Sequence, residues 1–224
     1  MIKCVIFDLD GTLLNTLPTI TYYLNRMHDR FGLMRVSEEM ARGMIGNGAK
    51  MLIRRSVAAG GGSVDELFDE AFTYYTEDYD KNSSYLTSPY EGIPEMLDEL
   101  AERGILLTVY TNKPATCAPD VIREIFGERF ARVVGADPSR PVKPAPDGGL
   151  VMLEELGISP AECAYLGDMT VDSETAKNLG VKLTVLADWG FGKKSDLEAS
   201  YHDHIISHPS ELVSLIDREN GGKE

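Results

Sequence analysis

Four short polar clusters in this 224-residue chain contain the residue types needed to bind an anion beside a divalent cation. The first is Asp8 with Asp10, directly after an apolar, partly β-branched run at 3–7 that predicts a buried strand; Gly11 then favours a turn. Open parallel sheets bind ligands beyond the carboxyl ends of their strands. The two acids could therefore line a ligand site, although they could also simply form a turn.

The second and third clusters contribute a hydroxyl, an amide and a cation. Thr111 and Asn112 follow an apolar run at 105–110, where a hydroxyl and backbone amides suit an anion. The same residues would also serve as a helix cap before Pro114. Lys143 precedes another helical pattern, within a proline-rich loop that restricts its backbone. It would need to point at the site, whereas most lysines in such loops are exposed.

The fourth cluster adds two more acids, Asp168 and Asp172, after an apolar run at 163–166. Carboxylates at this place can hold a hard divalent cation through oxygen, or can cap the next helix. Each cluster alone has a purely structural interpretation. All four, however, follow a strand or precede a helix of one expected sheet, so they should meet at one edge of it.

Alternating strand and helix patterns would position these clusters. We expect strands at 3–7, 105–110, 132–135, 163–167, 181–186 and, at an edge, 204–206. We expect helices at 93–103, 114–126, 146–156 and 171–179. This alternation predicts an α/β fold, a Rossmann-like parallel sheet with right-handed crossovers and helices on both faces.

Residues 16–84 interrupt this rhythm, because they show helical patterns only. These patterns cover 18–31, 37–44, 49–59 and 64–81. We therefore expect a small all-helical cap domain at 16–84, inserted after the first strand, and an α/β core domain at 1–15 and 85–224. The end, 220–224, is expected to fray.

Composition and charge exclude several classes of protein. The chain is 43% hydrophobic and 26% charged, as in ordinary soluble globular proteins. Its formal net charge of −14 repels nucleic acid and anionic membrane surfaces. No stretch has the roughly 18 apolar residues of a membrane span, and the opening apolar run is too short for a signal peptide. We expect a cytoplasmic monomer or homodimer that binds neither nucleic acid nor membrane.

The cysteines and histidines give weaker signals. The three cysteines are widely separated, and Cys4 and Cys163 lie in expected strands, so we expect reduced core thiols. His202, His204 and His208 cluster near the end of the chain. No carboxylate or cysteine pattern completes a metal site there, and we expect these side chains to be exposed.

DLDGT at 8–12, TNK at 111–113, KPAP at 143–146 and GDMTVD at 167–172 resemble, in this order, the four motifs of the haloacid-dehalogenase-like hydrolases. The resemblance covers essentially the whole chain. It implies that Asp8 is a nucleophile that forms an aspartyl-phosphate and that Asp10 is the general acid and then the base. Dehalogenases of the family lack that second acid, so Asp10 favours phosphoryl transfer.

The resemblance also implies a phosphate and metal site. Phosphate oxygens would contact Gly11, Thr111 and Asn112, and Lys143 would neutralise charge between nucleophile and phosphate. Mg²⁺ would bind Asp8, the backbone carbonyl of Asp10, and Asp168. Asp172 would be a weaker ligand or a support behind the ligands.

Within the family, the cap loop at 45–49, TNKP at 111–114 and WGFG at 189–192 resemble phosphoglycolate phosphatases. This implies a small phosphorylated metabolite as substrate, 2-phosphoglycolate first, contacted by Gly46, Asn47 and Gly48. Lys50, Arg42 or Arg54 could add positive charge. The two glycines could instead only shape a turn. A pyrophosphatase or nucleotide phosphatase, a phosphomutase of the β-phosphoglucomutase type and a non-catalytic binding protein remain alternatives.

Overall fold

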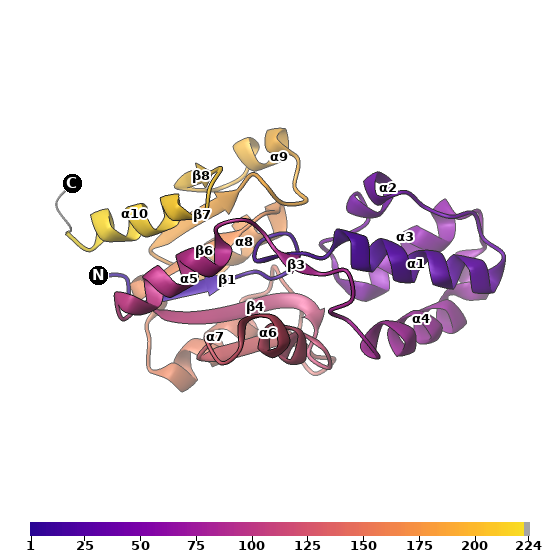
Figure 1. The fold of residues 1–224 in the computed structure, drawn as a ribbon, viewed down its shortest axis with the longest axis horizontal. Coiled ribbons are helices and arrows are strands. Elements are labelled where there is room, and N and C mark those ends of the chain that lie inside the picture. Colours follow the sequence, from indigo (N-terminus) through magenta and orange to yellow (C-terminus); the bar gives the residue numbers. More distant parts are fainter. Residues whose placement is uncertain (222–224) are drawn as a thin grey trace.

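The computed structural model describes residues 1–221 and confirms the α/β fold class. A parallel six-stranded sheet in the order β5-β4-β1-β6-β7-β8 forms its centre (Figure 1). The strands are β1 (Cys4–Phe7), β4 (Leu106–Pro114), β5 (Arg132–Ala136), β6 (Cys163–Gly167), β7 (Leu183–Ala187) and β8 (His204–Ile206). Strand order reverses at β1, which lies between β4 and β6, and this is where such sheets bind ligands.

The central strand β1 is apolar throughout because both of its faces are covered. Val5 and Phe7 pack into one buried cluster, whereas Cys4 and Ile6 pack into another on the opposite face. Three helices contribute to the first cluster: α5 (Ile93–Glu102), α6 (Ala118–Phe126) and α10 (Ser210–Glu219). Two contribute to the second: α7 (Asp147–Leu156) and α8 (Thr170–Leu179).

The boundary between β4 and α6 differs from the sequence-based expectation of a helix from 114. The strand continues through Pro114, with an irregular register after Tyr110, and α6 begins only at Ala118. Proline disfavours helical backbone at the residue before it, so Lys113 stays extended. The extra strand length carries Thr111 and Lys113 past the last pair between β4 and β1, which joins Phe7 and Val109.

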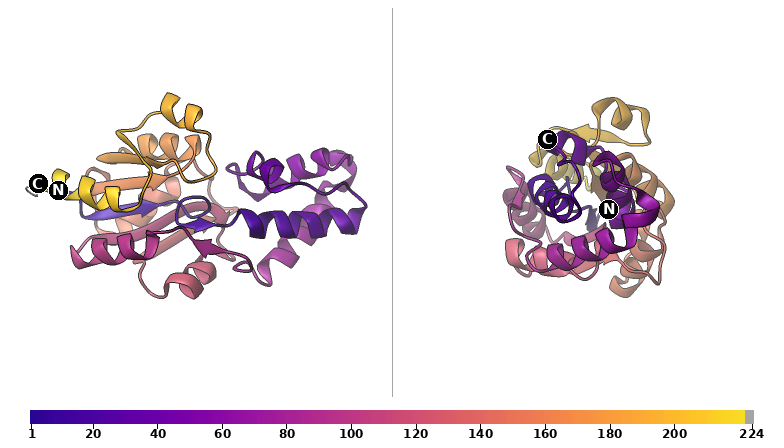
Figure 2. Two further views of the ribbon diagram at one scale, coloured as in Figure 1. Left: turned by 45° about the horizontal axis from the view of Figure 1, so that its top comes forward. Right: turned by 90° about the vertical axis from the view of Figure 1, so that its right-hand side faces the viewer.

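Four helices form a separate group at one end of the molecule, and the N-terminus and α10 lie at the other (Figures 1 and 2). They are α1 (Leu17–Phe31), α2 (Glu38–Arg42), α3 (Gly48–Ala59) and α4 (Val64–Asp80). The group has its own buried cluster, which includes Leu24, Met27 and Ile53. The domain boundaries at 15/16 and 84/85 stay predictions, and we call this group of helices the cap.

Small elements complete the chain. The cap is joined to the sheet through an antiparallel pair, β2 (Leu14–Asn15) and β3 (Ser88–Pro89). A 3₁₀ turn (Pro160–Glu162) precedes β6, and α9 (Lys194–Ala199) precedes β8. No helix within residues 1–221 is long and apolar enough to cross a membrane.

The expected fraying at 220–224 is wrong at its first residue. The Asn220 side chain accepts a hydrogen bond from the Ile2 amide at 2.5 Å and donates one to the Ile2 carbonyl at 3.0 Å. These bonds join the two ends of the chain. Residues 222–224 lie outside the described part.

Candidate active site

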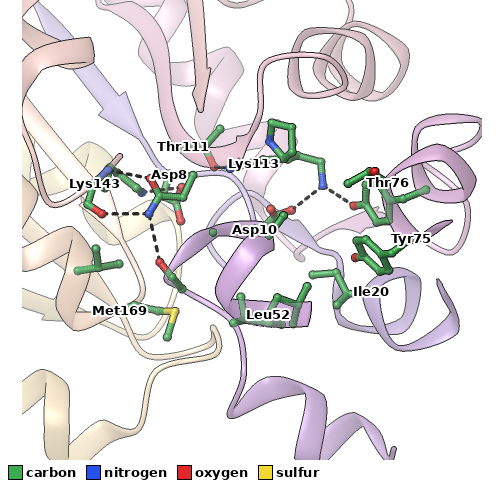
Figure 3. A pocket seen from close by; sticks show the side chains of 18 of the residues that line it. Asp8, Asp10, Ile20, Leu52, Tyr75, Thr76, Thr111, Lys113, Lys143 and Met169 are labelled. Carbon is green, nitrogen blue, oxygen red and sulfur yellow. Dashed lines mark hydrogen bonds and ion pairs between the residues drawn. The ribbon is translucent and has the colours of Figure 1, made fainter. Parts of the chain in front are cut away.

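The four polar clusters meet at the carboxyl edge of the sheet, facing the cap across a pocket (Figure 3). Asp8 follows β1, Thr111 lies near the end of β4, and Asp168 follows β6. Lys143 comes from the loop before α7 and, like Asp8 and Thr111, lines the pocket. Residues from distant parts of the chain thus form one site.

The side chain of Lys143 is buried, and its ammonium group contacts three neighbouring side chains. Its Nζ lies 2.8 Å from Asp8 Oδ1, and it donates to Asp172 Oδ1 at 2.7 Å and to the Tyr165 hydroxyl at 3.2 Å. The Asn112 side chain fixes the lysine backbone, accepting from Lys143 N at 2.8 Å and donating to Lys143 O at 3.2 Å. The ammonium is therefore held against the carboxylate of Asp8.

Burial and the neighbouring charges together determine the protonation states of Lys143 and Asp8. Burial alone would lower the pKa of Lys143, but Asp172 and Asp8 together raise it well above its ordinary value. The lysine is therefore cationic at neutral pH. Burial raises the pKa of Asp8 to about 6, against the opposing pull of Lys143. Asp8 is still mostly a carboxylate at neutral pH.

The side chain of Asp168 fits in its place because two neighbouring residues, Gly11 and Gly190, have no side chain. Thr12 Oγ1 donates to its Oδ1 at 2.6 Å, and the Phe191 amide donates to its Oδ2 at 2.7 Å. A Cβ atom on Gly11 or on Gly190 would lie 2.3 Å from Asp168 Oδ2. Gly11 also has a φ of +92°, which L side chains rarely adopt. Both glycines admit the acid at close range.

Asp8, Asp168 and Asp172 form a group that fits a divalent cation. One ligand oxygen of each lies within 4.8 Å of the others. Asp8 Oδ1 is buried and accepts no hydrogen bond from the described residues, since its contact with Lys143 is an ion pair without hydrogen-bond geometry. Burial and the neighbouring charges of Asp172 and Asp8 raise the pKa of Asp168 well above its usual range. A bound cation would relieve that repulsion.

Asp172 has its oxygens already engaged. Its Oδ1 accepts from Lys143 and, at 3.1 Å, from the Tyr165 hydroxyl. Its Oδ2 accepts from the amides of Asp168 at 3.2 Å and Met169 at 2.9 Å. A carboxylate has about four lone-pair positions, and these four contacts fill them. The geometry favours support over direct ligation.

Lys113 is a site residue to which the sequence assigned no role. Its side chain is 3% exposed, and its Nζ donates to Asp10 Oδ1 at 3.2 Å and to the hydroxyl of Tyr79 in α4. Burial opposes the charge, but Asp10 and Tyr79 raise the pKa of Lys113 overall. The acid Asp10 is thereby tied to the cap.

The cap loop contacts the same strand end. Asn112 Nδ2 donates to Gly46 O at 3.2 Å, and Gly46 and Gly48 line the pocket. Asn47 does not line it; its Oδ1 accepts from Arg55 at 2.7 Å. Thr111 Oγ1 faces the site but accepts from the Lys113 amide at 3.2 Å.

Gly11 and the cap cations lie elsewhere than the family resemblance implied. The Gly11 amide donates to Leu14 O at 2.8 Å, and Gly11 is not in the pocket wall. Arg42 donates to Gly190 O at 3.3 Å, and Arg54 lies over the Phe68 ring at 4.2 Å. Lys50 is exposed and also outside the wall.

The C-terminal histidines do not form a second metal group. His204 and His208 are exposed as expected, but His202 is only half-exposed because its Nδ1 contacts the Ser200 carbonyl at 2.9 Å. Within residues 1–221 the carboxylate trio is the one group of three potential ligands. All three cysteines are buried free thiols.

The fold and site together define an α/β protein in which carboxylates and lysines line a pocket between the sheet and the cap. The model of the haloacid dehalogenase-like hydrolases matches residues 5–186, and the chain belongs to this family.

Similar proteins match over almost their whole length. An N-acetylmuramic acid 6-phosphate phosphatase of Pseudomonas aeruginosa is 32% identical over 220 residues, covering 97% of this chain and 96% of that protein. A phosphoglycolate phosphatase of Aquifex aeolicus is 31% identical over 216 residues, covering 96% and 97%. A crystal structure described as a predicted phosphoglycolate phosphatase, from Haemophilus somnus, has a TM-score of 0.89 at 24% identity and covers 96% of this chain and 98% of its own. The last likeness concerns the fold alone.

Proposed function

We propose that the chain is a metal-dependent phosphatase that hydrolyses a small phosphate monoester through an aspartyl-phosphate on Asp8. The observation that carries this proposal is the buried Asp8 carboxylate, 2.8 Å from the Lys143 ammonium, at the base of the capped pocket. The family match and two relatives named as phosphatases, one of N-acetylmuramic acid 6-phosphate and one of phosphoglycolate, support it, and they favour hydrolysis over the phosphomutase alternative.

Phosphoryl transfer would proceed in two steps. An Asp8 oxygen forms a bond to phosphorus while the ester P–O bond breaks, and Asp10 gives its proton to the leaving alkoxide. Asp10 then takes a proton from a water molecule that attacks phosphorus, which releases phosphate and restores Asp8. Thr111 and Asn112 would hold phosphate oxygens, and Lys143 would offset their charge.

We propose Mg²⁺ as the cation, held by Asp8, Asp168 and the Asp10 carbonyl, with Asp172 as support. Bound there, Mg²⁺ would neutralise charge on the phosphate. The trio contains only oxygen ligands, which suits a hard cation. A cytoplasmic location, and a monomer or homodimer, remain predictions from the composition.

Inorganic phosphate release tests this proposal. We expect release from phosphate monoesters with Mg²⁺, and its loss with EDTA. Asp168→Asn should require much more Mg²⁺, whereas Asp120→Asn, at an exposed acid of α6, should behave as wild type. Release that persists unchanged in EDTA would contradict the metal requirement.

A further inference from the structure

The cap side of the pocket is apolar and aromatic. Ile20, Leu52 and Tyr75 lie together on the side of Asp10 that faces the cap (Figure 3). Tyr75 and Tyr79 stack with ring centroids 5.5 Å apart and an interplanar angle of 23°. The leaving group of a phosphate ester on Asp8 would lie against this wall.

No free cation of the described chain reaches that wall. Two cations line the pocket, and both are committed: Lys143 to Asp8 and Asp172, Lys113 to Asp10. The cap arginines are engaged elsewhere, as Arg55 shows by donating to Met44 O at 2.9 Å. The remaining charged group in the lining is an acid, Asp80.

We infer that the substrate's leaving group is an uncharged alcohol with an apolar or aromatic face, and that the site disfavours a carboxylate beside the phosphate. This inference rests on the proposed function and narrows its substrate. A carboxylate against this wall would lose hydration without meeting a free cation, and Asp80 would repel it. An apolar or aromatic group would instead gain burial and ring contacts.

Three phosphate esters of primary alcohols test the inferred leaving-group preference directly: 2-phosphoglycolate, its neutral amide and 2-phenylethyl phosphate. We expect kcat/KM of the amide and the phenylethyl ester to exceed that of 2-phosphoglycolate by about tenfold or more. A tenfold preference for 2-phosphoglycolate over its amide would overturn the inference and leave the phosphatase standing. Release from none of the three would overturn the proposed function itself.

A matched pair of substitutions in α3 provides a second test of the same inference. Ala49→Lys adds a cation at the pocket wall, whereas Met51→Lys adds one two residues later, at a side chain that is 40% exposed and outside the wall. We expect Ala49→Lys to shift the preference toward 2-phosphoglycolate by about tenfold relative to the amide, and Met51→Lys to leave it unchanged. Equal shifts from both, or none from Ala49→Lys, would contradict an uncharged wall as the source of selectivity.

Discussion

Lys113 connects the proposed general acid to the cap. Its ammonium contacts Asp10 from the sheet and Tyr79 from α4, and its side chain has almost no solvent exposure. A charge-assisted hydrogen bond from a buried ammonium fixes the orientation of the carboxyl group that accepts it. We interpret Lys113 as a positioning residue that acts through Asp10.

Substituting Lys113 should therefore impair leaving-group protonation in particular. For Lys113→Met we expect kcat to fall about 10- to 100-fold with an alkyl phosphate, and clearly less with p-nitrophenyl phosphate, whose leaving group needs little protonation. Steady-state rates with the two substrates check this. Lys194→Met, at an exposed lysine, is the control. Equal losses on both substrates would mean that Lys113 does not act through Asp10.

The sequence indicated most of the candidate site residues but not this one. Asp8 and Asp168 directly follow strands, so their meeting could be anticipated from the strand ends, whereas Lys143 lies in a loop and was placed at the site only by its motif. The partners of Lys113 are separated from it by 103 residues for Asp10 and by 34 for Tyr79. The pairing of β1 with β4 brings Asp10 near Lys113, but only the packing of the cap on the sheet brings Tyr79 there, and no local pattern encodes that contact.

The contacts made by the turn after β7 give a structural reason for the WGFG motif at 189–192. From the sequence, this motif was singled out only by family resemblance. Gly190 approaches the Asp168 side chain, and a Cβ on Gly192 would lie 2.2 Å from the Asp168 carbonyl oxygen. Trp189 Nε1 donates to Thr12 O at 3.1 Å, which ties the turn to the loop after β1. The turn thus encloses Asp168, and it supports this carboxylate without having to contact the substrate.

Gly190→Ala should weaken the metal site through this contact. The added Cβ would lie 2.3 Å from Asp168 atoms, so the carboxylate must move. We expect at least a tenfold rise in the Mg²⁺ concentration for half-maximal activity, on the scale of other supports behind metal ligands. Gly43→Ala is the control, because its nearest heavy atom is 3.5 Å away. Unchanged Mg²⁺ dependence would show that the turn tolerates the methyl group.

At the level of elements, most of the long periodic segments and the short strand at 204–206 were predicted, whereas the two-residue strands and α10 were not. The two-residue strands β2 and β3 are too short to show a period, and they form because the cap's two connections run side by side. The helix α10 has apolar residues at helical spacing, including Leu212, Leu215 and Ile216, but it is not among the helices expected from the sequence. The extension of β4 depends on Pro114 and on pairing with β5.

Without a bound cation, the burial of Asp8 and its repulsion by neighbouring carboxylates should lower the stability of the folded molecule at neutral pH. The folded-state pKa of Asp8, about 6, lies above its ordinary 3.8, so folding favours the protonated form. The stability this gives is fully present below pH 3.8 and is lost as the pH rises through 6.

In EDTA at pH 7.5, Asp8→Asn should therefore raise the free energy of unfolding by about 1–3 kcal/mol, and the gain should shrink toward pH 5. Urea unfolding at both pH values measures it. A variant that is less stable than wild type at pH 7.5 would contradict the electrostatic account.

The cap should close during turnover. The site must exclude water while Asp8 attacks and admit it for hydrolysis, and the contact of Asn112 with Gly46 is one that opening would break. We expect small-angle scattering to show a smaller radius of gyration with Mg²⁺ and a phosphate analogue than with Mg²⁺ alone. Identical curves would argue for a fixed cap.

The most direct test of the account is to trap the phosphoryl group on the chain. Enzyme quenched in acid during turnover with Mg²⁺ should carry one phosphoryl group, and peptide mapping should place it on Asp8. Asp8→Asn, which is nearly isosteric, should carry none and release no phosphate while still unfolding cooperatively. Turnover by Asp8→Asn near the wild-type rate, or an adduct on another residue, would contradict Asp8 as the nucleophile.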